Sequence, residues 1–246
     1  MISLKMLPLP TSPSLVPGGV QPVTVRLQRG ETLWVTGPAG AGKTALLETV
    51  ALRRPVMGSS LSIMNHEASS RLGSEARRQL RQRIGYIEAA PVFMNRLTVA
   101  DNIALPLELA HVRQADIQRE TESIIRWFQL EAQAGLLPDR LSHTMRLQVA
   151  CARALITQPS VILVDEPALT LCPALQDRLL TTIRGLTKNG ATALLATRTL
   201  PEAPALPGQA LSLPQAASPS SPPPGPSQSA ITAPLFLSPD DKGLLP

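Results

Sequence analysis

Eight consecutive residues, GPAGAGKT at positions 37–44, have the types and spacing needed to bind phosphate. They match G-x-x-x-x-G-K-[ST], in which glycines let several backbone N–H groups point at one anion, a geometry that side chains would obstruct. Lys43 would reach the outer phosphates of a nucleotide, and the Thr44 hydroxyl would ligate Mg²⁺. The predicted phosphate-binding residues are therefore Gly37, Pro38, Ala39, Gly40, Ala41, Gly42, Lys43 and Thr44.

The segments that flank this loop support the same interpretation. LWVT before it is typical of a buried strand, and ALLETVAL after it is typical of a helix, whose N-terminal dipole would attract phosphate. A glycine-rich turn that binds nothing would account for the eight residues alone. It would not account for their place between a strand and a helix, so we favour the phosphate site.

A pair of carboxylates ends the apolar segment VILVDEP, at residues 161–167. In a parallel sheet, the carboxyl end of such a strand lies at the edge where ligands bind. Asp165 would hold Mg²⁺ through water there, and Glu166 would polarise an attacking water as a general base. Glu166 and Lys43 are thus the predicted catalytic residues, and Thr44 and Asp165 are the predicted metal-binding residues.

Apolar strands alternate with helices along most of the chain, which predicts an α/β fold with a mainly parallel sheet covered on both faces. Strands are expected at 23–27, 32–37, 61–65, 83–87, 161–165 and 191–196, with an edge strand at 209–213. Helices are expected at 43–52, 74–82, after a cap at Thr98 or Asp101, at 115–134, 143–156 and 174–187. Residues 1–20, rich in Pro, Gly and Ser, are predicted to form a flexible leader, and the Pro- and Ser-rich residues 215–246 a disordered tail. One domain, 21–214, lies between them.

The chain is basic, with a net charge of +5, and much of the excess comes from one arginine-rich stretch. Its members are Arg71, Arg77, Arg78, Arg81 and Arg83. No aromatic residues are interleaved there to stack on bases, so we expect a solvated helix face and no nucleic-acid partner.

Cysteine use and hydropathy indicate the compartment. Cys151 and Cys172 form no metal-ligand or CxxC pattern, and Cys151 falls on an apolar helix as a small core residue. Such sparse use fits a reducing compartment. No run approaches the roughly 20 apolar residues of a membrane span, and the N-terminus lacks the features of a signal peptide. A cytoplasmic protein is expected, with any membrane role exercised through a partner.

The order of motifs resembles the ATP-binding subunit of ABC transporters. The phosphate loop is followed by an arginine-rich helix and IGY, then LTVADNIALPL, LSxxM…ARAL and VILVDEP. The similarity covers about residues 20–213, and ARALxxxPxxxLxDEP at 153–167 is its most specific part. TVADNIALPL and Met145 also resemble the branch that serves lipoprotein release, cell division and lipid asymmetry.

This resemblance implies a P-loop NTPase (RecA-like) core with a helical subdomain at about residues 90–157, binding ATP and Mg²⁺. Two such domains would close face to face, as a homodimer or as a heterodimer with another ABC ATPase. Each would bury ATP between its own phosphate loop and the signature segment of its partner. The pair would drive a membrane permease, which implies a peripheral position on the inner face of the cell membrane.

Several positions depart from the family pattern. The family signature LSGGQ is LSHTM here, so Ser142 remains while His143 and Thr144 replace the glycines. Ala89 stands where the family has its Q-loop glutamine, Cys172 where it has its D-loop aspartate, and Arg198 where it has its switch histidine. His143 is either a phosphate contact in trans or part of a polar cap with Ser142 and Thr144, and we favour the cap. Arg198 is either a γ-phosphate contact or a surface charge, and the sequence does not decide between them.

Two functional hypotheses follow. The first is an ABC-type ATPase that is weak alone or needs an intact partner, and the retained Glu166 favours it. The second is an ATP-binding regulatory or assembly subunit that does not hydrolyse ATP, which the altered positions favour. We prefer the first.

Overall fold

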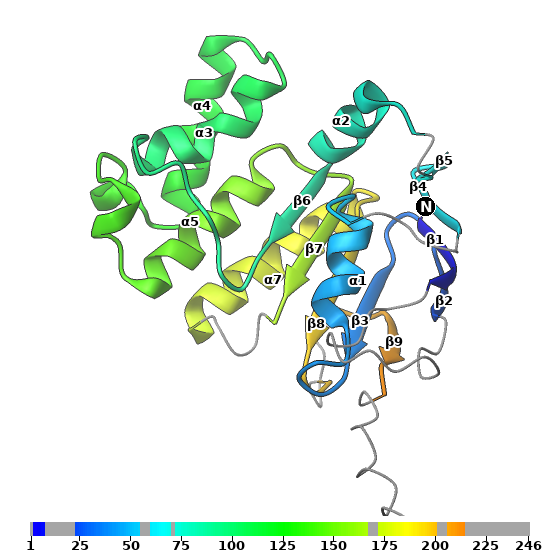
Figure 1. Cartoon of the computed structure of the whole chain (residues 1–246). Helices are drawn as coiled ribbons and strands as arrows, with labels where there is room; N and C mark the ends of the chain where they lie inside the picture. Colours follow the sequence, from blue (N-terminus) through cyan, green and yellow to red (C-terminus); the bar gives the residue numbers. More distant parts are fainter. Residues whose placement is uncertain are drawn as a thin grey trace, which may run out of the picture. The chain divides into compact units, whose positions relative to one another are not determined.

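The computed structural model describes residues 2–7, 23–54, 60–69, 72–166, 172–200 and 206–214 (Figure 1). All of them belong to one compact unit, Met1–Ala216. The strands are β1 (Ile2–Leu7), β2 (Val23–Leu27), β3 (Thr32–Thr36), β4 (Ser60–Ile63), β5 (His66–Glu67), β6 (Ile84–Ile87), β7 (Val161–Asp165), β8 (Thr192–Thr197) and β9 (Gln209–Ser212). The helices are α1 (Lys43–Val50), α2 (Ser74–Gln82), α3 (Val99–Leu109), α4 (Gln114–Trp127), α5 (His143–Leu155) and α7 (Pro173–Lys188), with short 3₁₀ turns η1 (Glu131–Gln133) and η2 (Pro138–Arg140).

A parallel sheet in the order β6-β7-β8-β3-β9 forms the centre of this unit. Every residue of β7 and β8 is buried, because alternate side chains enter two separate apolar clusters. Ile162 and Val164 face the cluster that contains α5 and α7, whereas Val161 and Leu163 face the cluster that contains α1. The sheet is therefore covered on both faces, as its continuous apolar strands predicted.

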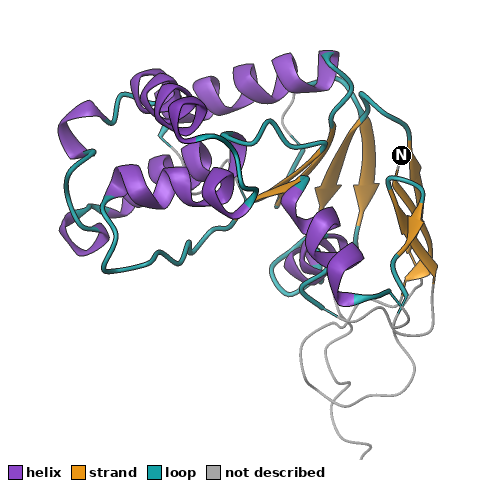
Figure 2. Cartoon of the chain, turned by 90° about the horizontal axis from the view of Figure 1, so that it is seen from above, coloured by secondary structure: helices purple, strands orange, loops and turns teal. Residues whose placement is uncertain are grey.

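A second sheet, β2-β1-β4-β5, is antiparallel and was not predicted (Figure 2). Its strand β1 contradicts the flexible leader for residues 2–7. Ile2 pairs with Leu27 on one side and Ile63 on the other and is fully buried. Pairing on both edges and burial of this residue hold the strand in place, although the proline-rich sequence after it suggested a loose segment. The rest of the leader, 1 and 8–20, and the tail 215–246 lie outside the described residues.

The helices α3, α4 and α5 pack together around apolar side chains that include Ile103, Ile117 and Leu147. They form the helical part expected between 90 and 157. The prediction of one helix over 115–134 is wrong at its C-terminal end. α4 ends at Trp127, where Phe128 turns into the core and Gln129 adopts a left-handed backbone conformation (φ 54°).

Polar contacts hold the chain where it enters these helices. Thr98 caps α3 and forms a reciprocal capping box with Asp101. Asn102, fully buried, accepts a hydrogen bond from Met94 N and donates to the carbonyls of Met94, Leu97 and Thr98. None of the helices in the described ranges combines the length and the apolar composition that a membrane span requires.

Candidate phosphate-binding site

The phosphate-binding loop connects β3 to α1 and depends on glycine. Gly37, Gly40 and Gly42 have φ values of 151°, 78° and 90°, a region that residues with a Cβ rarely adopt. At Gly37 a Cβ would also lie 2.7 Å from the carbonyl oxygen of Leu213. The loop can therefore hold this conformation, with the N-terminus of α1 directly after it, only with the residue type found there.

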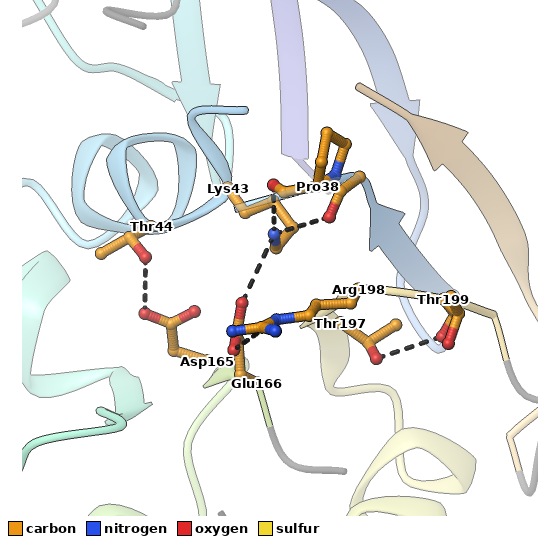
Figure 3. Close-up of polar contacts among 9 residues, drawn as sticks. Pro38, Lys43, Thr44, Asp165, Glu166, Thr197, Arg198 and Thr199 are labelled. Carbon is orange, nitrogen blue, oxygen red and sulfur yellow. Dashed lines mark hydrogen bonds and ion pairs between the residues drawn. The ribbon is translucent and has the colours of Figure 1, made fainter. Parts of the chain in front are cut away.

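Lys43 is the first residue of α1, and its side chain turns back across the loop (Figure 3). Its ammonium donates to the carbonyls of Gly37, at 2.7 Å, and Pro38, at 2.9 Å. It also lies 3.4 Å from Oε1 of Glu166. The residue is only 5% exposed, so a single cation is held at the inner side of the loop, where phosphate oxygens would meet it.

Thr44 and Asp165 come together from α1 and the end of β7. Thr44 Oγ1 donates a 2.8 Å hydrogen bond to Asp165 Oδ2. The second oxygen of this carboxylate, Oδ1, is buried and has no hydrogen-bond partner among the described residues. Burial raises the pKa of Asp165 above its ordinary value, and the nearby Glu166 adds to the rise, whereas the Thr44 hydrogen bond opposes it.

These two residues fit a magnesium ion. A hydroxyl and a carboxylate are hard oxygen ligands of the kind that Mg²⁺ prefers, and the unpartnered Oδ1 is a buried acceptor that a cation would satisfy. Thr44 and Asp165 would supply part of an octahedral shell, with phosphate and water oxygens completing it. Bound Mg²⁺ would neutralise charge on the phosphates during transfer.

The raised pKa of Asp165 predicts a gain in stability when its charge is removed. The folded chain binds this proton more tightly than the unfolded chain, so the protonated carboxyl favours folding at low pH. That contribution is lost as the pH rises through the folded-state pKa. Without Mg²⁺, Asp165→Asn should raise the free energy of unfolding at pH 7 by about 1 kcal/mol, because it removes an ionised buried group but keeps its shape.

Urea unfolding in EDTA at pH 7 and at low pH measures this effect. The gain should shrink as the pH falls, and Asp139→Asn, which changes an exposed carboxyl, serves as the matched control. A loss of stability for Asp165→Asn at pH 7 would contradict the assignment.

Glu166 follows β7 directly and lies between two cations. Its Oε1 is near the Lys43 ammonium, and its Oε2 is 3.8 Å from Nε of Arg198 (Figure 3). Its backbone has a φ of 44°, an uncommon conformation for a residue with a Cβ. Such strain persists only where the surroundings enforce it, and it is common at functional sites. The site therefore gathers a buried cation, a metal-type oxygen pair and a strained carboxylate at the ends of β3 and β7.

A family profile described as "ABC transporter" matches residues 20–169. The chain belongs to this family. The resemblance to ABC transporters that the order of motifs indicated is thereby confirmed.

Relatives of the ABC domain include proteins named for methionine import. The chain is 36% identical over 180 residues to the methionine import ATP-binding protein MetN 2 of Bacillus cereus, covering 72% of this chain and 52% of that protein. It is 33% identical over 177 residues to the methionine import ATP-binding protein MetN of Bordetella pertussis, covering 71% and 48%. The chain spans about half the length of these curated relatives. They do not support the branch that serves lipid and lipoprotein traffic.

Solved structures share the ABC fold. A dimeric bacterial ABC transporter cassette superposes with a TM-score of 0.77 at 22% identity, covering 87% of this chain and 94% of that one. A cassette dimer in a post-hydrolysis state, bound to ADP and Pi, gives a TM-score of 0.72 at 22% identity, with coverages of 81% and 88%. The predicted P-loop NTPase fold is thereby confirmed.

The altered signature of this ABC domain begins α5. Ser142 caps the helix by accepting a hydrogen bond from Met145 N at 3.3 Å, which confirms the capping role for this serine. His143 and Thr144 follow on the exposed first turn. A contact in trans would involve a second chain, so a role for Ser142, His143 and Thr144 at a partner's phosphate stays a prediction.

The other departures from the family pattern have different surroundings. Glu88, beside Ala89, forms an ion pair with Arg53 at 2.7 Å. Cys172 is exposed just before α7. Cys151 is buried in the core, as expected, and burial raises the pKa of its thiol to about 12. Arg198 contacts Glu166, an arrangement that neither sequence interpretation of Arg198 anticipated.

Proposed function

We propose that this chain is the ATP-binding subunit of an ABC importer, that it hydrolyses Mg-ATP to drive a membrane permease, and that the transported molecule is methionine or a close relative. The observation that carries the proposal is the convergence of Lys43, Thr44, Asp165 and Glu166 at one edge of the parallel sheet. The names of the relatives supply the substrate class.

Each residue has a distinct task in this proposal. The N–H groups of the loop and the Lys43 ammonium bind the β- and γ-phosphates and stabilise their charge. Thr44 and Asp165 hold Mg²⁺. Glu166 orients a water for attack on the γ-phosphorus and accepts its proton. The strained backbone of Glu166 supports this task, because it keeps the carboxylate beside Lys43.

The partners follow from the same family. A second ABC ATPase, identical or different, would close on the phosphate loop and place its signature segment there. A cleft of about 840 Å³ beside β6 offers a place for the permease. Five arginines line it together with apolar residues, which suits an acidic amphipathic segment: Arg53, Arg77, Arg78, Arg81 and Arg153. Docking of this kind would hold the chain at the inner face of the cell membrane.

A second candidate function is ATP binding without hydrolysis, in a regulatory or assembly subunit. It is favoured by the bulk that His143 and Thr144 add where the family has glycines, and by Arg198 in place of histidine. These changes lie outside the set formed by Lys43, Asp165 and Glu166, so we rank hydrolysis first.

Uptake of radiolabelled methionine tests the substrate class. In cells that normally carry this gene, we expect the change Lys43→Ala to reduce methionine uptake by at least about tenfold and to leave uptake of an unrelated solute such as proline unchanged. Lys188→Ala, at the exposed end of α7, is the matched control. Normal methionine uptake with Lys43→Ala would reject methionine as the substrate.

A further inference from the structure

The helices α3 and α4 border a cavity of about 540 Å³ (Figure 1). Its apolar floor is made by Ala100 and Ala104 of α3, whose small side chains leave the space open, and by Ile117 and Ile125 of α4. The stretch 131–134 closes one end. A cavity of this volume is in the range that binds small molecules, and its lining is separate from the phosphate-binding loop.

The exposed rim of the cavity carries four carboxylates and one cation. The carboxylates are Asp101 and Glu108 of α3, Glu122 of α4 and Glu131 of η1, and the cation is Arg126. Neither Glu108 nor Glu131 has an ion-pair or hydrogen-bond partner for its carboxylate within the described ranges. Negative charge therefore predominates around an apolar floor, although the chain as a whole is basic.

Acidic side chains of α4 that lie away from the cavity are paired with arginines. Oδ2 of Asp116 lies 2.8 Å from Nη2 of Arg113, and its Oδ1 lies 3.0 Å from Nη2 of Arg119. The same Nη2 of Arg119 lies 3.2 Å from Oε1 of Glu120. The carboxylates at the cavity lack such compensation, so a cationic ligand would complement them.

Thr121 lines the cavity from the middle of α4. The residue is 7% exposed, and its Oγ1 is buried without a hydrogen-bond partner among the described residues. Thr49 and Thr182, also in helices, donate to the carbonyl four residues earlier, as threonines in helices commonly do. Thr121 makes no such bond, so an N–H group of a ligand would give its oxygen the partner that buried polar atoms normally have.

The carboxylates lie toward opposite ends of the cavity. Asp101 and Glu108 are seven residues apart on α3, which separates their Cα atoms by about 10 Å along the helix axis. The backbone N–H of Ala100 donates to the carbonyl of Ala134 at 2.9 Å, so the turn that carries Glu131 lies at the Asp101 end. A ligand that satisfies both ends would therefore carry a positive charge at each end of an extended apolar chain.

We propose that this cavity binds a linear aliphatic polyamine. One terminal ammonium would pair with Glu108, and the other with Asp101 and Glu131, which together outweigh the charge of Arg126. The methylene groups would cover the alanines and isoleucines of the floor. This site is distinct from the Mg-ATP site, and the inference does not depend on the proposed hydrolysis.

Isothermal titration of the purified full-length chain with spermidine, at low ionic strength and without nucleotide, tests the site. We expect one spermidine per chain with a Kd of about 1 mM or tighter. Glu108→Gln should weaken binding at least about fivefold, because it removes a charge-assisted hydrogen bond. Thr121→Val should weaken it about threefold without lowering the melting temperature, since it deletes an unpaired hydroxyl. Glu120→Gln, away from the cavity, is the matched control and should bind normally.

Two related amines distinguish a built site from general attraction to acidic side chains. Cadaverine is too short to reach both ends, and acetylated spermidine lacks one terminal charge, so each should bind at least about fivefold more weakly than spermidine. Spermidine should also raise the melting temperature of the unmodified chain and of Glu120→Gln more than that of Glu108→Gln. No saturable binding of spermidine, equal binding of the three amines, or unchanged affinity in Glu108→Gln would overturn the inference.

Discussion

Lys43→Ala is expected to weaken Mg-ATP binding by at least about 100-fold. The ammonium is 5% exposed, and it bonds two loop carbonyls and lies beside Glu166. Its removal takes away the buried cation that phosphate would meet, and leaves the carbonyls of Gly37 and Pro38 without this donor. Isothermal titration of the purified chain with Mg-ATP measures the loss.

Two control measurements accompany this titration. Lys188→Ala removes an exposed lysine from the last turn of α7 and should bind Mg-ATP normally. Circular dichroism of Lys43→Ala should show an intact fold. Unchanged affinity for Mg-ATP in a folded Lys43→Ala chain would show that the phosphate loop is not the ATP-binding site.

Glu166→Gln is expected to reduce the rate of phosphate release by about 100-fold or more, because an amide cannot accept the proton of the attacking water. The side chain keeps its shape, and Lys43, Thr44 and Asp165 are unchanged, so affinity for Mg-ATP should be retained. The measurement is steady-state phosphate release with the permease present.

Glu131→Gln, an exposed carboxylate of η1, is the matched control for this change and should be without effect. Loss of Mg-ATP affinity in Glu166→Gln would show that the carboxylate supports binding instead of chemistry.

The central sheet could be predicted because its strands are continuous apolar runs. VILVD and the strand before GPAGAGKT are buried on both faces, and strands buried in this way have continuous apolar sequences. The sequence of β1 indicated a strand less clearly. Its six residues precede a proline-rich stretch, and they become a strand only through pairing with β2 and β4, which are distant in sequence. The end of α4 depends on the turn at Gln129, which no local pattern of residues signalled.

Part of the site could likewise be predicted from the sequence, and part could not. The spacing of Lys43, Thr44, Asp165 and Glu166 was sufficient to name them, and the structure brings them together. The contact of Arg198 with Glu166 depends on the register of β7 against β8, which the sequence alone does not reveal. The strained backbone of Glu166 and the unpartnered oxygen of Asp165 are likewise properties of the folded chain.

Hydrolysis of ATP, as opposed to ATP binding alone, is the central function proposed for this chain. A single-turnover experiment tests this directly, with the full-length chain and its permease in excess over radiolabelled Mg-ATP. We predict that the nucleotide recovered from the wild-type chain is ADP, with phosphate formed in equal amount, while Glu166→Gln retains intact ATP. Recovery of intact ATP from the wild-type chain after hours of incubation would contradict the account and favour a subunit that only binds ATP.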